Sequence, residues 1–139
     1  MIGLKVLFVC RANSRRSQAA AGIFNSISTK HTAMSAGLEV ALEEREGLPI
    51  KQDNIDIMRS MGYDISGGVR KQLTKSMIDE ADQVVWMLEK EKVPRYLSNS
   101  GKLVFMEVEN PSDMNEVMRR DNILQVERKV KEFAASLEG

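Results

Sequence analysis

Residues 5–18 have the sequence KVLFVCRANSRRSQ, and this stretch indicates the fold of the chain. Residues 5–9 form a short, largely apolar run with β-branched valines, which is typical of a buried parallel strand. Residues 16–25 are rich in good helix formers and predict a helix. The residues between these two elements therefore form a loop that joins the carboxyl end of a strand to the amino end of a helix.

This loop has the composition of an anion-binding site. Cys10 and Arg16 are separated by five residues, enough for the backbone to curl around a tetrahedral oxyanion with N–H groups pointing inward. The unpaired amides and the dipole of the helix attract anions, and the same field favours a thiolate over a thiol. Arg15 and Arg16 stand where the first turn of a helix prefers acids, a conflict that a bound anion resolves. A Walker-type phosphate loop is excluded because its glycine-lysine signature is missing.

The loop residues can be assigned roles in a reaction at a bound oxyanion. Cys10 is the only cysteine; such a residue is often an inert apolar side chain, but the basic loop makes it our candidate nucleophile. The planar guanidinium of Arg16 can bind two oxygens of a transition state. The Ser17 hydroxyl can donate to the thiolate, and Asn13 tolerates a positive φ. The substrate-binding residues that we predict in the loop are Arg11, Ala12, Asn13, Ser14, Arg15, Arg16 and Ser17.

Length, composition and charge describe one ordinary domain. The chain has 139 residues, 42% of them hydrophobic, which suffices for one core, and we expect a single domain over residues 1–139. Twenty basic residues balance twenty acidic ones, so no global field favours nucleic acid or an anionic membrane as a partner. The sequence shows no apolar run long enough to span a membrane and no recognisable secretory signal. We therefore expect a cytoplasmic protein, and a monomer.

Two further chemistries find little support in the sequence. No group of residues has the spacing of metal ligands, so we expect neither a metal nor another cofactor. His31 is the only histidine and lies near the start of the second predicted strand. We expect it at the surface, at the opposite end of the sheet from Cys10, rather than in a cysteine–histidine dyad.

Beyond the loop, predicted strands and helices alternate along the chain. The apolar patterns predict strands over 5–9, 32–36, 83–87 and 103–108, and helices over 16–25, 49–61, 74–80, 89–97 and a long final segment that Asp113 begins as N-cap. Residues 39–48 form an acidic connection close to the loop. Right-handed crossovers then give a single-domain three-layer α/β sandwich, a four-stranded parallel sheet with helices on both faces.

The sequence resembles a known family in several segments. Residues 6–18 are similar to the signature loop of the low-molecular-weight protein tyrosine phosphatases and of the arsenate reductases that share their fold. Residues 35–37 (SAG), 61–66 (MGYDIS) and 71–74 (KQLT) resemble further family segments, in the family's order. The resemblance covers essentially the whole chain. It implies the strand order 2-1-3-4, which places Cys10 at the switch point of the sheet, where a crevice opens.

The chain departs from the family at the proton donor. The phosphatases carry an Asp-Pro pair after the fourth strand, whose aspartic acid protonates the leaving group, but here the pair is Asn110-Pro111. An amide cannot supply that proton. We keep Asn110 as a substrate-binding residue and Asp113 as the candidate catalytic acid, with Glu109 as the alternative, although Asp113 can also cap a helix. The aromatic residues that line a phosphotyrosine pocket in the family are missing from 38–48 and 112–115.

The resemblance leaves three functions open. The first is a cysteine-dependent phosphomonoester hydrolase that forms a phosphocysteine intermediate and acts on a phosphorylated protein or a small phosphomonoester. The second is an arsenate reductase that uses an external thiol, because this chain lacks the two further cysteines of thioredoxin-coupled members and has residues 86–88 where one of them would begin. The third is a phosphate-binding module with little turnover. We expect the phosphatase.

Overall fold

The computed structural model describes residues 3–110 and 114–138 and is built on a four-stranded parallel sheet. The strands lie in the order β2-β1-β3-β4, which confirms the expected α/β class and strand order. Because β1 pairs with β2 on one side and β3 on the other, it is the strand where the chain switches direction across the sheet. The strands are β1 (Lys5–Cys10), β2 (Thr32–Gly37), β3 (Gln83–Trp86) and β4 (Leu103–Phe105).

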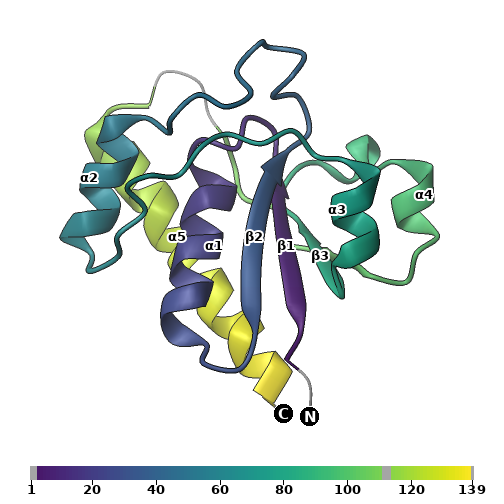
Figure 1. Ribbon diagram of the computed structural model, residues 1–139. Helices are drawn as coiled ribbons and strands as arrows, with labels where there is room; N and C mark the ends of the chain where they lie inside the picture. Colours follow the sequence, from purple (N-terminus) through teal and green to yellow (C-terminus); the bar gives the residue numbers. More distant parts are fainter. Residues whose placement is uncertain (1–2, 111–113, 139) are drawn as a thin grey trace.

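Helices cover both faces of this sheet. Figure 1 shows α1, α2 and α5 on one side and α3 and α4 on the other, which is the expected three-layer arrangement. The elements are α1 (Arg16–Ile27), α2 (Gln52–Ser60), α3 (Lys75–Glu80), the 3-10 turn η1 (Lys90–Lys92), α4 (Arg95–Ser98) and α5 (Glu116–Glu138). Within residues 3–110 and 114–138, no helix combines the length and apolar character needed to cross a bilayer.

The side chains of β1 alternate between two separate apolar cores. Val6 and Phe8 belong to the core under α1, α2 and α5, whereas Leu7 and Val9 belong to the core under α3 and α4. This alternation follows from the period of two along a strand. All four side chains are buried. The apolar run that predicted this strand therefore reflects burial on both of its faces.

Three phenylalanines join the sheet to the two longest helices. Phe8 on β1, Phe24 on α1 and Phe133 on α5 lie with ring centroids 5.9 to 6.1 Å apart. The edge-on and tilted geometries are those that aromatic pairs prefer. The cluster fixes α1 on the sheet, and with it the start of α1 beside Cys10.

Two of the helices that differ from their predicted bounds do so near a proline. We placed Pro49 in the first turn of a helix, but it forms an antiparallel bridge with Val69, and α2 begins only at Gln52. Residues 89–97 are not one helix, because Pro94 separates η1 from α4. Val93 is extended (φ −67°, ψ 125°), as expected of a residue before proline.

The final helix begins later than its predicted cap. α5 starts at Glu116, and the side chain of Asn115 accepts a hydrogen bond from the Met118 amide at 2.9 Å. Asn115 therefore provides a capping bond that we had assigned to Asp113. Asp113 itself lies outside the described residues.

His31 lies where expected along the sheet but is not at the surface. Its side chain is buried, and its Nδ1 accepts a hydrogen bond from the Leu4 amide at 2.8 Å. Thr32 pairs with Lys5 at one end of β1, and Gly37 pairs with Cys10 at the other. The whole length of β1 therefore separates His31 from Cys10, which rules out a dyad between them.

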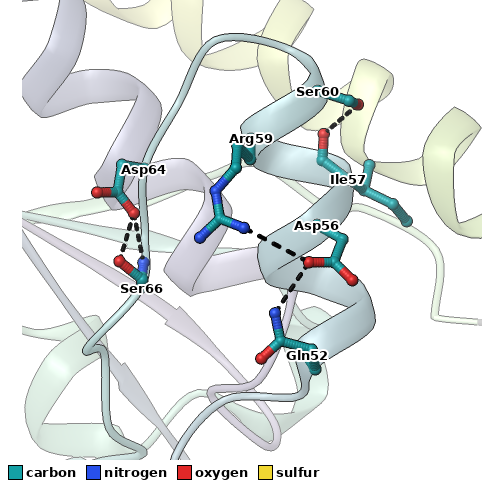
Figure 2. Close-up of polar contacts among 7 residues, drawn as sticks. All are labelled: Gln52, Asp56, Ile57, Arg59, Ser60, Asp64 and Ser66. Atoms are coloured by element: carbon teal, nitrogen blue, oxygen red, sulfur yellow. Dashed lines mark hydrogen bonds and ion pairs between the residues drawn. The ribbon is translucent and has the colours of Figure 1, made fainter.

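Polar contacts stabilise α2 and the turn that follows it. Figure 2 shows Asp56 accepting a hydrogen bond from Gln52 and lying near Arg59, with the Asp56–Arg59 ion pair at 3.7 Å. In the turn, Asp64 accepts bonds from the amide and hydroxyl of Ser66. These exposed contacts stabilise α2 and the turn after it, and the start of α2 contributes to the site described next.

Candidate active site

The loop after β1 is held tightly between β2 and α1. Cys10 ends β1 and is buried, and α1 begins at Arg16 with no acidic residue in its first turn. A Cβ atom on Gly37 of β2 would lie only 2.7 Å from the Arg11 carbonyl and 2.9 Å from the Asn13 amide. Only glycine fits there, so the loop packs directly against the backbone of β2.

The Cys10 sulfur receives two hydrogen bonds from its own loop. The amide of Asn13 donates to Sγ at 3.3 Å, and the Ser17 hydroxyl lies 2.9 Å from it. Because the Asn13 side-chain amide donates to Ser17 Oγ at 2.7 Å, the Ser17 hydrogen is free to donate to the sulfur. Two donors on one sulfur stabilise a thiolate, the form that acts as a nucleophile.

The buried Asn13 stabilises the conformation of the loop. It has a positive φ of 53°, a conformation that asparagine tolerates better than most residues. Its Oδ1 accepts bonds from the Lys71 amide at 2.8 Å and from Gln18 Nε2 at 3.1 Å. The supporting function predicted for Asn13 therefore has a structural basis, and Asn13 contributes it from a buried position beneath the cavity.

Arg16 is anchored by two backbone carbonyls. Its Nη1 donates to the carbonyls of Met87 at 3.1 Å and Val108 at 3.0 Å. Met87 directly follows β3, and Val108 lies three residues after β4. Burial lowers the pKa of Arg16, and the charge of Cys10 opposes this shift. With Nη1 occupied, Nε and Nη2 are the groups left to bind an oxyanion beside Cys10.

Arg15 connects the loop to the segment that carries Asn110. Its Nη2 donates to Asn110 Oδ1 at 2.6 Å, and its Nε donates to Asn122 Oδ1 at 3.0 Å. Asn122, on α5, also donates to the Glu109 carbonyl at 2.8 Å. Burial and the neighbouring Arg16 lower the pKa of Arg15. The sequence predicted that Arg15 and Asn110 are both site residues, but not that they bond to each other.

The loop opens into a polar cavity of about 250 Å³. Three of the predicted site residues, Cys10, Arg16 and Asn110, line it together. Its lining residues are Cys10, Arg11, Ala12, Ser14, Arg15, Arg16, Glu43, Arg45, Lys51, Asn54, Arg70 and Asn110. Asn13 and Ser17 lie beneath this surface and support it through the bonds given above. Within the described parts of the chain, no cluster of three histidine, cysteine or acidic side chains could hold a metal ion.

Five lining residues were missed by sequence reasoning, although one segment was expected nearby. Glu43 and Arg45 belong to the acidic connection 39–48, whose position close to the loop is confirmed. Lys51 and Asn54 come from the start of α2, and Asn54 donates to the Ser14 carbonyl at 3.0 Å. Arg70 comes from the strand-like segment that pairs with Leu48. No local signal marks these residues, because long-range pairing brings them to the site.

The candidate acids lie at different places. Glu109 is exposed and borders a smaller hollow beside Arg11 and Arg16, not the main cavity. Asp113 lies outside the described residues. Asn110, at the position of the family's acid, is exposed at the rim of the main cavity.

Comparisons with known proteins agree with this geometry. The family model described as low molecular weight phosphotyrosine protein phosphatase matches residues 5–138. The chain belongs to the low molecular weight phosphotyrosine protein phosphatase family. Membership in this family makes the chain a phosphatase that uses a cysteine, and Cys10 is present at the required place. No curated protein matches the sequence.

Solved structures of other phosphatases in this fold are similar over nearly their whole length. Wzb of Vibrio vulnificus, in complex with benzylphosphonate, has a TM-score of 0.87 at 18% identity over 96% of this chain and 99% of that one. A low molecular weight protein tyrosine phosphatase of T. tengcongensis has a TM-score of 0.82 at 25% identity, over 96% and 99%. The arginine phosphatase YwlE of Geobacillus stearothermophilus has a TM-score of 0.81 at 22% identity, over 97% and 93%.

Proposed function

We propose that this phosphatase hydrolyses phosphomonoesters through a phosphocysteine intermediate on Cys10, with Arg16 as the clamp for the transferred group. The observation that carries the proposal is the arrangement of the two side chains. Cys10 Sγ receives two hydrogen bonds, and Arg16 is fixed beside it on the carbonyls of Met87 and Val108. Nucleophile and clamp are thus held in place before a substrate binds.

In the first step, the Cys10 thiolate attacks phosphorus in line with the ester oxygen. The S–P bond forms as the P–O bond to the leaving group breaks, and the leaving oxygen takes up a proton. The loop amides and Arg16 hold the three equatorial oxygens, on which the negative charge of the transition state is spread.

In the second step, water attacks the phosphocysteine and releases inorganic phosphate. The S–P bond breaks, and the electron pair returns to the sulfur as thiolate. The Ser17 hydroxyl and the Asn13 amide stabilise that thiolate, so they favour it as a leaving group here as well as a nucleophile in the first step.

The proton for the leaving group does not come from Asn110, since an amide is no acid at neutral pH. Asp113 stays our proposed acid, from its position in the sequence. Substrates whose leaving groups need no proton, such as para-nitrophenyl phosphate, are therefore the most sensitive probes of the cysteine chemistry.

The direct test is an assay of para-nitrophenyl phosphate hydrolysis by the native protein and three variants. We expect turnover by the native protein, none by Cys10→Ser with phosphate binding retained, and weaker turnover and phosphate binding by Arg16→Ala. The control is Arg59→Ala, which removes an arginine on the exposed face of α2 and should behave like the native protein.

Three results would overturn the proposal. Arsenite production from arsenate and an added thiol, without hydrolysis of the aryl phosphate, would identify an arsenate reductase. Tight phosphate binding without either reaction would identify a binding module. Turnover by Cys10→Ser at the native rate would remove Cys10 from the mechanism.

A further inference from the structure

We propose that the active-site cavity binds a second anionic group of the same substrate, a carboxylate or another phosphate, on Arg45, Lys51 and Arg70. The substrate class is then a phosphomonoester with a second negative charge near the phosphoryl group. This inference rests on the proposed function, which places the phosphoryl group at Cys10. It adds a subsite formed by residues outside the phosphate loop.

The cavity contains far more positive charge than one phosphoryl group requires. Six basic side chains and a single acidic one, Glu43, line it, although the protein as a whole has no net charge. The basic residues are Arg11, Arg15, Arg16, Arg45, Lys51 and Arg70. A cleft lined by one sign of charge concentrates ligands of the opposite sign.

Three of these six basic side chains already bind a protein partner or the phosphoryl group. Arg16 clamps the phosphoryl group. Arg15 donates to Asn110 and Asn122, and Arg11 lies 3.9 Å from Glu39. Within residues 3–110 and 114–138, no ion pair involves Arg45, Lys51 or Arg70. These three come from residues 39–51 and 68–72, two segments that pair with each other and are separate from the phosphate loop.

Arg70 provides the second observation. Its side chain is only 6% exposed, and its Nε has no hydrogen-bond partner among the described residues. Its backbone is fixed, because its amide donates to the Leu48 carbonyl and its carbonyl accepts from the Gly47 amide, both at 2.8 Å. A buried, unpaired guanidinium is costly unless an anion binds to it. The structure thus holds Arg70 in place for an acceptor that the chain does not supply.

The charges next to Arg70 also favour the binding of an anion. Burial lowers the pKa of Arg70 and the charge of Arg45 lowers it further, while Glu43 opposes both. Two arginines held close together repel each other, and an anion between them removes the repulsion. Glu43 offsets part of this charge, but it provides one negative charge against two positive ones.

The remaining lining favours recognition by charge rather than by ring stacking. No aromatic residue is among the described residues that line the cavity. A phenyl ring would therefore find no partner ring, and a cationic group next to the phosphate would meet Arg45 and Arg70. An arginine phosphate is disfavoured on this ground, whereas a neighbouring carboxylate or phosphate is favoured.

The test compares three benzylphosphonates that differ only in the para substituent. Para-carboxymethylbenzylphosphonate and para-phosphonomethylbenzylphosphonate carry a second anion, while para-carbamoylmethylbenzylphosphonate is the neutral match. Their affinities for the native protein are measured by calorimetry. We expect at least one anionic probe to bind about tenfold tighter than the amide, as one or two added charged hydrogen bonds imply. The two anionic probes separate a carboxylate from a second phosphate.

Variants test whether Arg70 and Arg45 cause the preference for the anionic probes. Arg70→Gln and, independently, Arg45→Gln should reduce the ratio of anionic to neutral affinity to nearly one. Arg45 is exposed, so its variant keeps the test valid if Arg70→Gln fails to fold. Arg59→Gln makes the same change in net charge on the outer face of α2 (Figure 2) and should keep the native ratio.

Equal affinities of all three probes for the native protein would overturn the subsite. The subsite would also be overturned if Arg59→Gln abolished the preference for the anionic probes as fully as Arg45→Gln does. The preference would then reflect the net charge of the protein. Since binding needs no turnover, these results are independent of the para-nitrophenyl phosphate assay, whose failure would overturn the proposed reaction instead.

Discussion

Arg15 and Asn110 form a hydrogen bond at the rim of the cavity, where the family places its general acid. The bond from Arg15 Nη2 to Asn110 Oδ1 is 2.6 Å long. An aspartate in place of Asn110 would form an ion pair with Arg15, and a paired carboxylate stays ionised and cannot donate a proton. An arginine at position 15 and an acid at position 110 are therefore poorly compatible in one mechanism.

This incompatibility gives a prediction at the residue scale. Asn110→Asp alone should raise the hydrolysis of an alkyl phosphate only slightly. The double variant Arg15→Ala/Asn110→Asp should raise it by about 10²-fold or more relative to Arg15→Ala, the usual range for general-acid assistance. Rates with para-nitrophenyl phosphate should change far less, because that leaving group needs no proton.

The comparison is made in an Asp113→Ala background, so that any proton from Asp113 is removed. A large gain from Asn110→Asp alone would contradict the incompatibility. So would equal gains with alkyl and para-nitrophenyl phosphate.

Sequence patterns are informative at the residue scale only where the function depends on local spacing. Cys10, Arg16 and the loop between them could be predicted, since their chemistry depends on one strand–loop–helix junction. The carbonyls of Met87 and Val108 that anchor Arg16 could not, because they come from the segments that follow β3 and β4. The bond between Arg15 and Asn110 likewise joins residues 95 positions apart.

At the scale of elements, a single tyrosine links the turn after α2 to α5. The Tyr63 hydroxyl donates to Glu127, which also pairs with Lys131 at 3.7 Å. Burial raises the pKa of Tyr63 to about 12, and Glu127 contributes to the shift. The folded state thus favours the protonated phenol. The stability that this bond contributes is complete below pH 10, the ordinary pKa of tyrosine, and is lost as the pH rises toward 12.

We therefore expect Tyr63→Phe to lower the free energy of unfolding by about 1 kcal/mol at pH 7, the usual contribution of one hydrogen bond. Urea denaturation followed by circular dichroism measures the change. Tyr96→Phe is the matched control, since Tyr96 is 46% exposed on α4, and it should unfold like the native protein. An unfolding midpoint of Tyr63→Phe equal to that of Tyr96→Phe would show that the bond does not stabilise the fold.

The element boundaries show where local patterns lose predictive value. The apolar patterns placed all four strands in the right segments, because burial on a sheet face requires those patterns, although β4 ends at Phe105 and not at 108. They failed at Pro49, which pairs with Val69, and at Pro94, which interrupts a predicted helix. Both errors concern connections, whose shape depends on distant pairing partners rather than on local periodicity.

At the scale of the whole molecule, charge is balanced overall but concentrated at one end of the sheet. The net charge of zero predicted no global field for nucleic acid or an anionic membrane and left anion binding to local features, and basic residues from three separate segments meet at the carboxyl end of β1. Only the arginines of the loop were visible as a cluster in the sequence. Arg45, Lys51 and Arg70 join them through the pairing of residues 47–50 with 68–70.

The chemistry of Cys10 is tested most directly by trapping the intermediate. The protein is mixed rapidly with para-nitrophenyl phosphate, quenched in acid and digested, and the peptide that contains Cys10 is analysed by mass spectrometry. We expect one phosphoryl group on Cys10 during turnover, and none in Cys10→Ser. Sustained hydrolysis with no phosphoryl group on Cys10, under a quench that preserves a control phosphocysteine peptide, would contradict the mechanism.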